Sequence, residues 1–323
     1  MRILGFVILA MCLLPGAIQP SRAGGDGYPS RPVKFIIPAN KGGGTDVSFR
    51  LLAGALEPLL GQKIEIANLP ADSGAEGLTA LASATPDGYT LGAVWNGPLT
   101  ASPQVRQLPY SLGSFTVVAG TFESDYLICA HKDFPAATGA EFVALLQQQP
   151  FRYTYGNEGK GGSGFFAAER LFDTLRVFVR SESFDGSSAV AKNFAGGKVD
   201  FYVGSAPPVM PHIKSGDAKC LVIMGKAKPG LFPNAAAAGE LGAQENEAAL
   251  WRMVLAPKGL PAGKAAKLEA AIRRAMATPI MLTFFAEQGE RPIMQDRAQT
   301  LARLKAEYAT FSEAAEKLGL KPE

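Results

Sequence analysis

The sequence predicts an α/β protein of two lobes, each built on a mainly parallel sheet flanked by helices. Short apolar runs alternate with amphipathic helical patterns along the chain, which is typical of parallel sheets covered by helices. The 323 residues exceed what one hydrophobic core usually serves. One series of strands and helices is embedded inside another, so the chain must pass twice between two lobes. Two such passages form a hinge.

The first 23 residues are typical of a secretory signal peptide. Arg2 precedes an apolar run from Ile3 to Leu14, and Ser21-Arg22-Ala23 provides the small residues of a cleavage site. The run is shorter than the roughly 20 apolar residues that a membrane-spanning helix needs. We therefore expect a periplasmic protein with no membrane-embedded segment in the mature chain.

Composition limits the partners of the mature chain. Removal of residues 1–23 leaves 30 Lys and Arg against 29 Asp and Glu, and there is no basic run. This balance argues against nucleic acid as a partner. We expect no cofactor, no metal and a monomeric state. Cys129 and Cys220 lie in apolar, strand-like runs, and we expect two buried free thiols rather than a disulfide.

The first series begins with a strand at Val33 to Pro38. A helical pattern follows, ends at Gly61, and has on one face Val47, Leu51, Leu52, Ala55, Leu56 and Leu59. Further strands are expected at residues 64–67 and 89–94, with a helix at 78–83 between them.

Two apolar runs at residues 115–120 and 126–130 lead into the embedded series, whose first helix begins after Thr138. Strands are expected there at 152–155, 176–179, 199–203 and 218–224, with helices at 164–172, 188–194 and 208–214. A strand at 251–256 and three helical patterns between Pro261 and Leu318 follow. We expect crossings near 121–126 and 220–226, so that the first lobe comprises residues 24–122 plus 225–323 and the second 123–224.

The loop between the first strand and the first helix is the clearest candidate site. Its glycines allow successive backbone N–H groups to face a ligand, and a helix N-terminus attracts anions. Thr45 or Asp46 could cap the helix. Gly43 is expected to need a conformation closed to valine, and Lys41 is the single cation in the loop. The candidate ligand-binding residues here are Ala39, Asn40, Gly42, Gly43, Gly44, Thr45 and Asp46.

A second glycine cluster raises a rival interpretation. Gly159, Gly161 and Gly164 form a literal G-x-G-x-x-G with Asp185 further on, as in dinucleotide-binding oxidoreductases. Residues 156–158 separate this motif from its strand, and Glu158 would bring negative charge near a pyrophosphate. The chain also has only two histidines and no G-x-S-x-G motif. We therefore expect a binding protein rather than an enzyme.

Loops at the carboxyl ends of strands share one edge of an open α/β sheet, where ligands bind. Four such loops, after Pro38, Val94, Tyr155 and the strand before Phe184, could therefore converge on one cleft. Outside the first loop, the candidate ligand-binding residues in these and neighbouring loops are Trp95, Asn96, Asn157, Gly161, Ser163, Asp185, Ser187 and Ser205.

The chain resembles the exported substrate-binding proteins of tripartite tricarboxylate transporters, the Bug proteins. The resemblance covers about residues 28–322 and rests on Tyr28-Pro29-Ser30-Arg31-Pro32-Val33, Gly42-Gly43-Gly44-Thr45-Asp46, Leu60-Gly61-Gln62 and Pro86-Asp87-Gly88-Tyr89-Thr90-Leu91. It implies a type II Venus flytrap that binds small carboxylates between its lobes. It also implies membrane components of the transporter as partners, and a sensor that reports to a membrane receptor is the alternative.

Two departures from the family pattern bear on the ligand. Asp185 stands where the family usually has Lys or Arg, and Glu158 stands where Pro is frequent. If both acids face the cleft, a second carboxylate would be repelled. We therefore expect a ligand with one carboxylate and a neutral or cationic remainder, such as an amino acid or a monocarboxylate.

Overall fold

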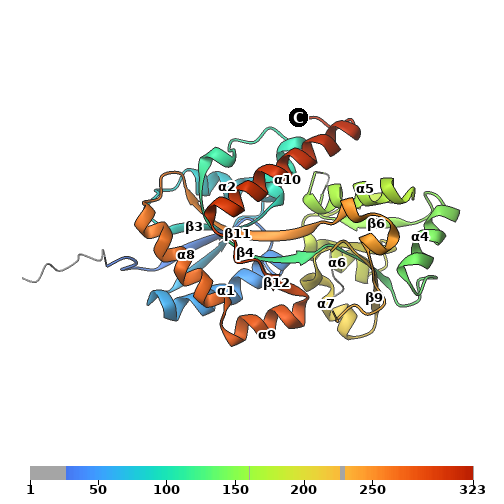
Figure 1. The fold of residues 1–323 in the computed structure, drawn as a ribbon, viewed down its shortest axis with the longest axis horizontal. Coiled ribbons are helices and arrows are strands. Elements are labelled where there is room, and N and C mark those ends of the chain that lie inside the picture. The colour runs from blue at the N-terminus through green and yellow to red at the C-terminus, as the bar shows by residue number, and fades with distance from the viewer. Residues whose placement is uncertain (1–26, 160, 226–229, 323) are drawn as a thin grey trace, which may run out of the picture.

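The computed structural model describes residues 27–159, 161–225 and 230–322, so the expected signal peptide lies outside the described residues. Two six-stranded sheets lie side by side, each with helices on its faces (Figure 1). The first sheet has the strand order β12-β4-β11-β3-β1-β2, and the second has the order β10-β9-β5-β8-β6-β7. We call the two halves the first and the second lobe.

The first sheet contains the expected strand, loop and helix at its start. Its strands are β1 (Val33–Ile37), β2 (Ile64–Asn68), β3 (Thr90–Trp95), β4 (Phe115–Asp125), β11 (Ala249–Pro257) and β12 (Glu290–Pro292). Its helices are α1 (Gly44–Leu60), α2 (Ala75–Ala82), α3 (Gly97–Thr100), α8 (Ala262–Met276), α9 (Pro279–Gln288) and α10 (Arg297–Lys317). Apolar side chains of α1, α8 and α9 pack on one face of this sheet.

The second sheet holds the embedded series. Its strands are β5 (Leu127–His131), β6 (Thr154–Asn157), β7 (Arg180–Ser183), β8 (Phe201–Gly204), β9 (Ala218–Ile223) and β10 (Ala236–Ala237). Its helices are α4 (Gly139–Gln148), α5 (Ser163–Leu175), α6 (Ser187–Ala195) and α7 (Ala206–Lys214). Thr138 caps α4 as expected, because its hydroxyl oxygen accepts a hydrogen bond from the Glu141 N–H.

The predicted fold class is confirmed, and both sheets are mixed. Helical crossovers make β1 parallel to β2 and β3, and β6 parallel to β7 and β8. By contrast, β11 is antiparallel to β3 and β4, and β5 is antiparallel to β8 and β9. The strands that join the two lobes are therefore the ones that break the parallel pattern.

The lobes are joined where β4 passes into β5 and where the chain returns into β11 (Figure 1). The Tyr126 N–H donates to the Ala248 oxygen, and the Met224 N–H donates to the Tyr126 oxygen. The first crossing lies where it was expected. The second lies before Ala249 rather than near residues 220–226, because β10 still pairs with β9 in the second sheet.

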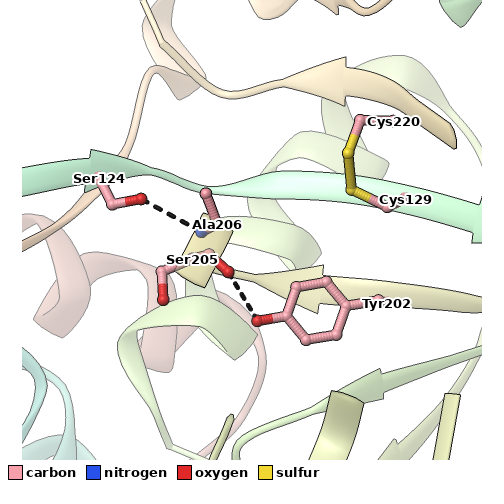
Figure 2. Close-up of a disulfide and its surroundings, with 6 residues drawn as sticks. All are labelled: Ser124, Cys129, Tyr202, Ser205, Ala206 and Cys220. Carbon is pink, nitrogen blue, oxygen red and sulfur yellow. Dashed lines mark hydrogen bonds between the residues drawn. A yellow bond between two sulfur atoms is a disulfide. The ribbon is translucent and has the colours of Figure 1, made fainter. Parts of the chain in front are cut away.

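Two local predictions are wrong. The strand expected at residues 176–179 is β7 at Arg180–Ser183, because Arg176 adopts a left-handed conformation that ends α5. Cys129 and Cys220 are not free thiols. They face each other on the neighbouring strands β5 and β9 and form a disulfide, with a Cα–Cα distance of 3.9 Å (Figure 2).

Candidate functional site

A pocket of about 60 Å³ lies between the lobes, at the ends of strands from both sheets. The first lobe contributes the loops after β1 and β3, and the second lobe contributes the loops after β6, β7 and β8. The four loops expected to converge therefore line one pocket, and the loop after β8 joins them. Candidate residues on its wall are Ala39, Asn40, Gly43, Thr45, Trp95, Asp185, Ser187 and Ser205.

Four helices begin at this pocket. The N-cap residues of α1, α5, α6 and α7 all line it, and none of the four helices has a side-chain cap. A helix start carries partial positive charge, and its first backbone N–H groups can donate to a ligand. At α7 the Ala206 N–H is already engaged, because it donates to the Ser124 hydroxyl at 3.2 Å (Figure 2). These N-cap residues are Gly43, Gly162, Gly186 and Ser205. The pocket is therefore built to attract an anion.

The loop before α1 is folded differently from the expectation in two respects. Neither Thr45 nor Asp46 caps the helix, because the N-cap is Gly43. The φ of Gly43 is −71°, which any residue can adopt, whereas Gly42 has a φ of +81° that favours glycine. The expectation that Gly43 needs a conformation closed to valine is therefore wrong.

Gly44 has a steric role at the start of α1. A Cβ atom placed on Gly44 would stand 2.9 Å from the Ser205 Oγ and 3.1 Å from the Arg252 Nη2. Only a residue without a side chain leaves this space open between the helix start and the second lobe.

Asp46 supports the loop rather than the pocket. Its carboxylate accepts hydrogen bonds from the Gly42 N–H at 2.9 Å, from Arg50 Nε at 2.9 Å and from Asn68 Nδ2 at 2.8 Å. Asn68 also donates to the Ala39 oxygen. Asp46 is buried, and these bonds fix the conformation of the turn that precedes α1.

Arg252 was not among the site residues predicted from the sequence. It lies fully buried on β11, where its Nη1 donates to Glu290 at 2.6 Å and its Nε donates to the Thr45 hydroxyl at 3.3 Å. Its Nη2 has no hydrogen-bond partner among the described residues. A single arginine within the apolar strand-like run 251–256 was the signal in the sequence, because a buried guanidinium needs partners.

Ser205 and Glu158 also present unpaired atoms to the pocket. The Ser205 Oγ is buried and has no partner among the described residues, whereas its backbone oxygen accepts a hydrogen bond from Tyr202 (Figure 2). Glu158 lines the pocket with an enclosed Oε1 that is likewise unpaired within the described chain. Burial raises the pKa of Glu158 to about 7, although the nearby Arg252 acts in the opposite direction.

Direct contacts hold the two lobes together at the pocket. The Asn40 Nδ2 donates to the Asp185 backbone oxygen at 2.8 Å, and the Gly44 N–H reaches the Ser187 hydroxyl at 3.5 Å. Asp185 itself is exposed at the rim. The structure therefore shows the lobes closed over the pocket.

Several predicted site residues lie beside the pocket and support its loops. Asn157 donates to Ser181 and accepts from the Gly159 N–H and the Ser183 hydroxyl. Ser163 pairs with the Tyr126 hydroxyl at 2.7 Å. Asn96 and Gly161 also lie beside the pocket. Asn96 donates a hydrogen bond to Glu307. Gly161 packs closely on Val105, since a Cβ atom placed on Gly161 would stand 2.0 Å from the Val105 side chain.

No helix in the described part of the chain is long and apolar enough to cross a bilayer.

A similar protein is found in Agrobacterium vitis, in the intergenic region of ttuE and ttuC′. It is 28% identical over 317 residues, covering 97% of this chain and 90% of that protein.

Solved structures share the fold. A periplasmic transporter has a TM-score of 0.86 and 25% identity, covering 91% of this chain and 99% of that one. MatC from Rhodopseudomonas palustris, solved with bound malate, has a TM-score of 0.81 and 27% identity, covering 89% and 100%. The profile of the tripartite tricarboxylate transporter family receptors, TctC, matches residues 48–320. The chain therefore belongs to the TctC family of periplasmic binding proteins.

Proposed function

We propose that this protein captures a small carboxylate-bearing molecule between its lobes and delivers it to the membrane components of a tripartite transporter. The observation that carries the proposal is the set of four helix starts around one pocket between the lobes, with the unpaired Nη2 of Arg252 beside the start of α1. Aligned N–H groups and a buried guanidinium are the donors that a carboxylate needs in a site shielded from water.

The ligand is proposed to carry a single carboxylate, as an amino acid or a monocarboxylate does. MatC was solved with malate, which has two carboxylates. In this chain, two acidic residues of the second lobe, Glu158 and Asp185, line the pocket. A second carboxylate placed there would lose affinity through repulsion between like charges.

Capture is proposed to involve no chemical reaction. Closure of the lobes buries the ligand, and the ligand favours the closed form because it contacts residues of both lobes only in that form. The expected signal peptide of residues 1–23 would export the chain to the periplasm, where such a protein meets its ligand.

A thermal-shift screen tests this function. The mature protein is heated with single members of a panel of citrate, succinate, malate, acetate, benzoate, NAD and the common amino acids. A ligand at about 100 times its Kd adds about 2.7 kcal/mol to the free energy of unfolding. We expect large shifts with some amino acids or monocarboxylates. The proposed function would be contradicted if NAD alone raised the melting temperature, or if no member of the panel raised it.

A further inference from the structure

The described residues contain five buried side-chain polar atoms without a hydrogen-bond partner; two of them belong to residues that line the pocket, and a third lies beside the start of α1. They are Arg252 Nη2, Ser205 Oγ and Glu158 Oε1. The first two lie within 3.1 Å of one point, which is the position that a Cβ atom on Gly44 would occupy. Buried polar atoms are rarely left unpaired, so these three atoms, at and beside one pocket, indicate a missing polar ligand.

The three atoms require a ligand with two kinds of polar group. Arg252 can only donate hydrogen bonds, whereas an ionised Glu158 can only accept them. The nearest tyrosine hydroxyls are already engaged, since Tyr202 donates to the Ser205 oxygen and Tyr126 pairs with Ser163. Glu158 Oε1 therefore lacks a donor among the described residues, and a ligand that carries a donor group would supply one.

We infer that the site recognises the paired ammonium and carboxylate of an α-amino acid, with Glu158 as the residue that selects the ammonium. This rests on the proposed function, in which the carboxylate lies at the start of α1 beside Arg252. The cavity of about 60 Å³ has room for a small polar head group. Trp95, Pro38 and Leu250 line other parts of the pocket and give the ligand's side chain apolar contacts.

A ligand without the amine would fit the same place less well. Its carboxylate would still reach the helix start, but the enclosed Oε1 of Glu158 would stay without a donor among the described residues. Leaving a buried polar group unsatisfied costs about 1–3 kcal/mol. This difference predicts a preference of about 10-fold or more for the amine-bearing member of a matched pair.

Isothermal titration at pH 7.5 with matched pairs tests the inference. The probes are alanine and propionate, leucine and 4-methylpentanoate, and aspartate and succinate. They are titrated into the wild-type protein, Glu158→Gln, and the control Glu182→Gln. Glu182 lies on β7 of the same lobe, in an ion pair with Lys198 that is partly exposed to solvent. Gln keeps the shape of the side chain but cannot pair with an ammonium through its charge.

We expect the wild type and Glu182→Gln to prefer the amine-bearing probe of at least one pair by about 10-fold or more. Glu158→Gln should lose most of that preference while its affinity for the amine-free partner stays within about threefold. Equal or tighter binding of the amine-free acids by the wild type would overturn the inference and leave the proposed function standing. If no probe of either kind bound, both would fail.

Discussion

The two lobes present opposite chemistry to the pocket that they share. The first lobe contributes the start of α1 and the buried cation Arg252, and so offers mainly hydrogen-bond donors. The second lobe contributes three helix starts but also Glu158 and, at the rim, Asp185. A carboxylate is thus best held by the first lobe, and a donor group is best held by the second.

This difference explains why selection of the ligand depends on closure of the two lobes. A ligand held by the first lobe alone would leave Glu158 and Ser205 of the second lobe without partners. Only a closed protein brings both sets of atoms within reach of one small molecule. Substitutions in one lobe at a time separate the two contributions.

The largest effect is expected for Arg252→Met in the first lobe. This substitution leaves Glu290 buried without its cation, which should lower the free energy of unfolding by about 3 kcal/mol. Chemical denaturation measures the loss. The double variant Arg252→Met, Glu290→Gln should recover most of the stability, because no buried charge remains unpaired, but not the affinity for the carboxylate. Full affinity in the double variant would show that Arg252 does not contact the ligand.

Gly44→Val should weaken binding by about 100-fold while leaving the protein folded. The added side chain would fill the space between the start of α1, Ser205 and Arg252. Gly54→Val is the matched control, because a Cβ atom on Gly54 of the same helix meets nothing within 4 Å. Titration calorimetry on both variants distinguishes the filling of this space from a general effect of valine on the helix. Equal losses in the two variants would refute the role of Gly44.

The second lobe should make binding of an amino acid depend on pH. The pKa of Glu158 is raised from 4.5 to about 7, so below pH 7 the unliganded protein holds a proton there. An ammonium ligand must displace that proton, and its affinity should rise by up to about 10-fold per pH unit as the pH increases toward 7. Above pH 7 it should level off. Titrations between pH 5.5 and 8 measure this slope.

The other titratable groups around Glu158 should not produce the slope. Burial raises the pKa of Tyr126 and of Tyr202 well above the usual value for tyrosine, so neither hydroxyl loses its proton in this range. Glu158→Gln should therefore bind with little pH dependence. A slope that persists in this variant would assign the proton to a group other than Glu158.

The same raised pKa affects stability without ligand. A carboxyl group whose pKa is higher in the folded protein stabilises the fold when it is protonated. That contribution is complete below about pH 4.5 and is lost as the pH rises through 7. The melting temperature of the wild type should therefore fall, relative to Glu158→Gln, between pH 5 and 7. A parallel course of the two curves would contradict the assigned pKa.

The smallest effect is expected for Lys41→Ala. Lys41 is exposed and is not among the residues on the wall of the pocket. Its charge should therefore be screened by water, and the affinity should change by about twofold or less. A loss of 10-fold or more on titration would show that the charge of Lys41 contributes directly to ligand binding.

Local patterns allowed the sequence to predict much of the fold. The alternation of strand and helix, and the glycine loop between β1 and α1, depend on neighbouring residues and are correctly placed. The Cys129–Cys220 disulfide was not predicted, because it depends on the pairing of β5 with β9, 91 residues apart. The end of α5 was misplaced since Arg176 adopts a left-handed conformation that usually favours glycine.

In the site, too, features set by local patterns were predicted, whereas contacts between residues far apart in the sequence were not. The loops that line the pocket were predicted from their positions after strands, but Arg252 reaches Thr45 across 207 residues of sequence. Asp46 and Asn157 have residue types that suit ligand binding, yet their polar atoms are used to hold the loops. Sequence patterns indicate which loops meet, whereas only the fold decides which of their polar atoms remain free.

The position of the bound carboxylate is the most direct test of the central claim. It can be measured by a crystal structure of the protein with the tightest-binding acid from the screen. We predict that the carboxylate lies at the start of α1, within hydrogen-bond distance of a backbone N–H of Gly44 or Thr45 and of the Arg252 Nη2. A carboxylate bound instead against the loops of the second lobe, with Arg252 Nη2 still unpaired, would contradict this account.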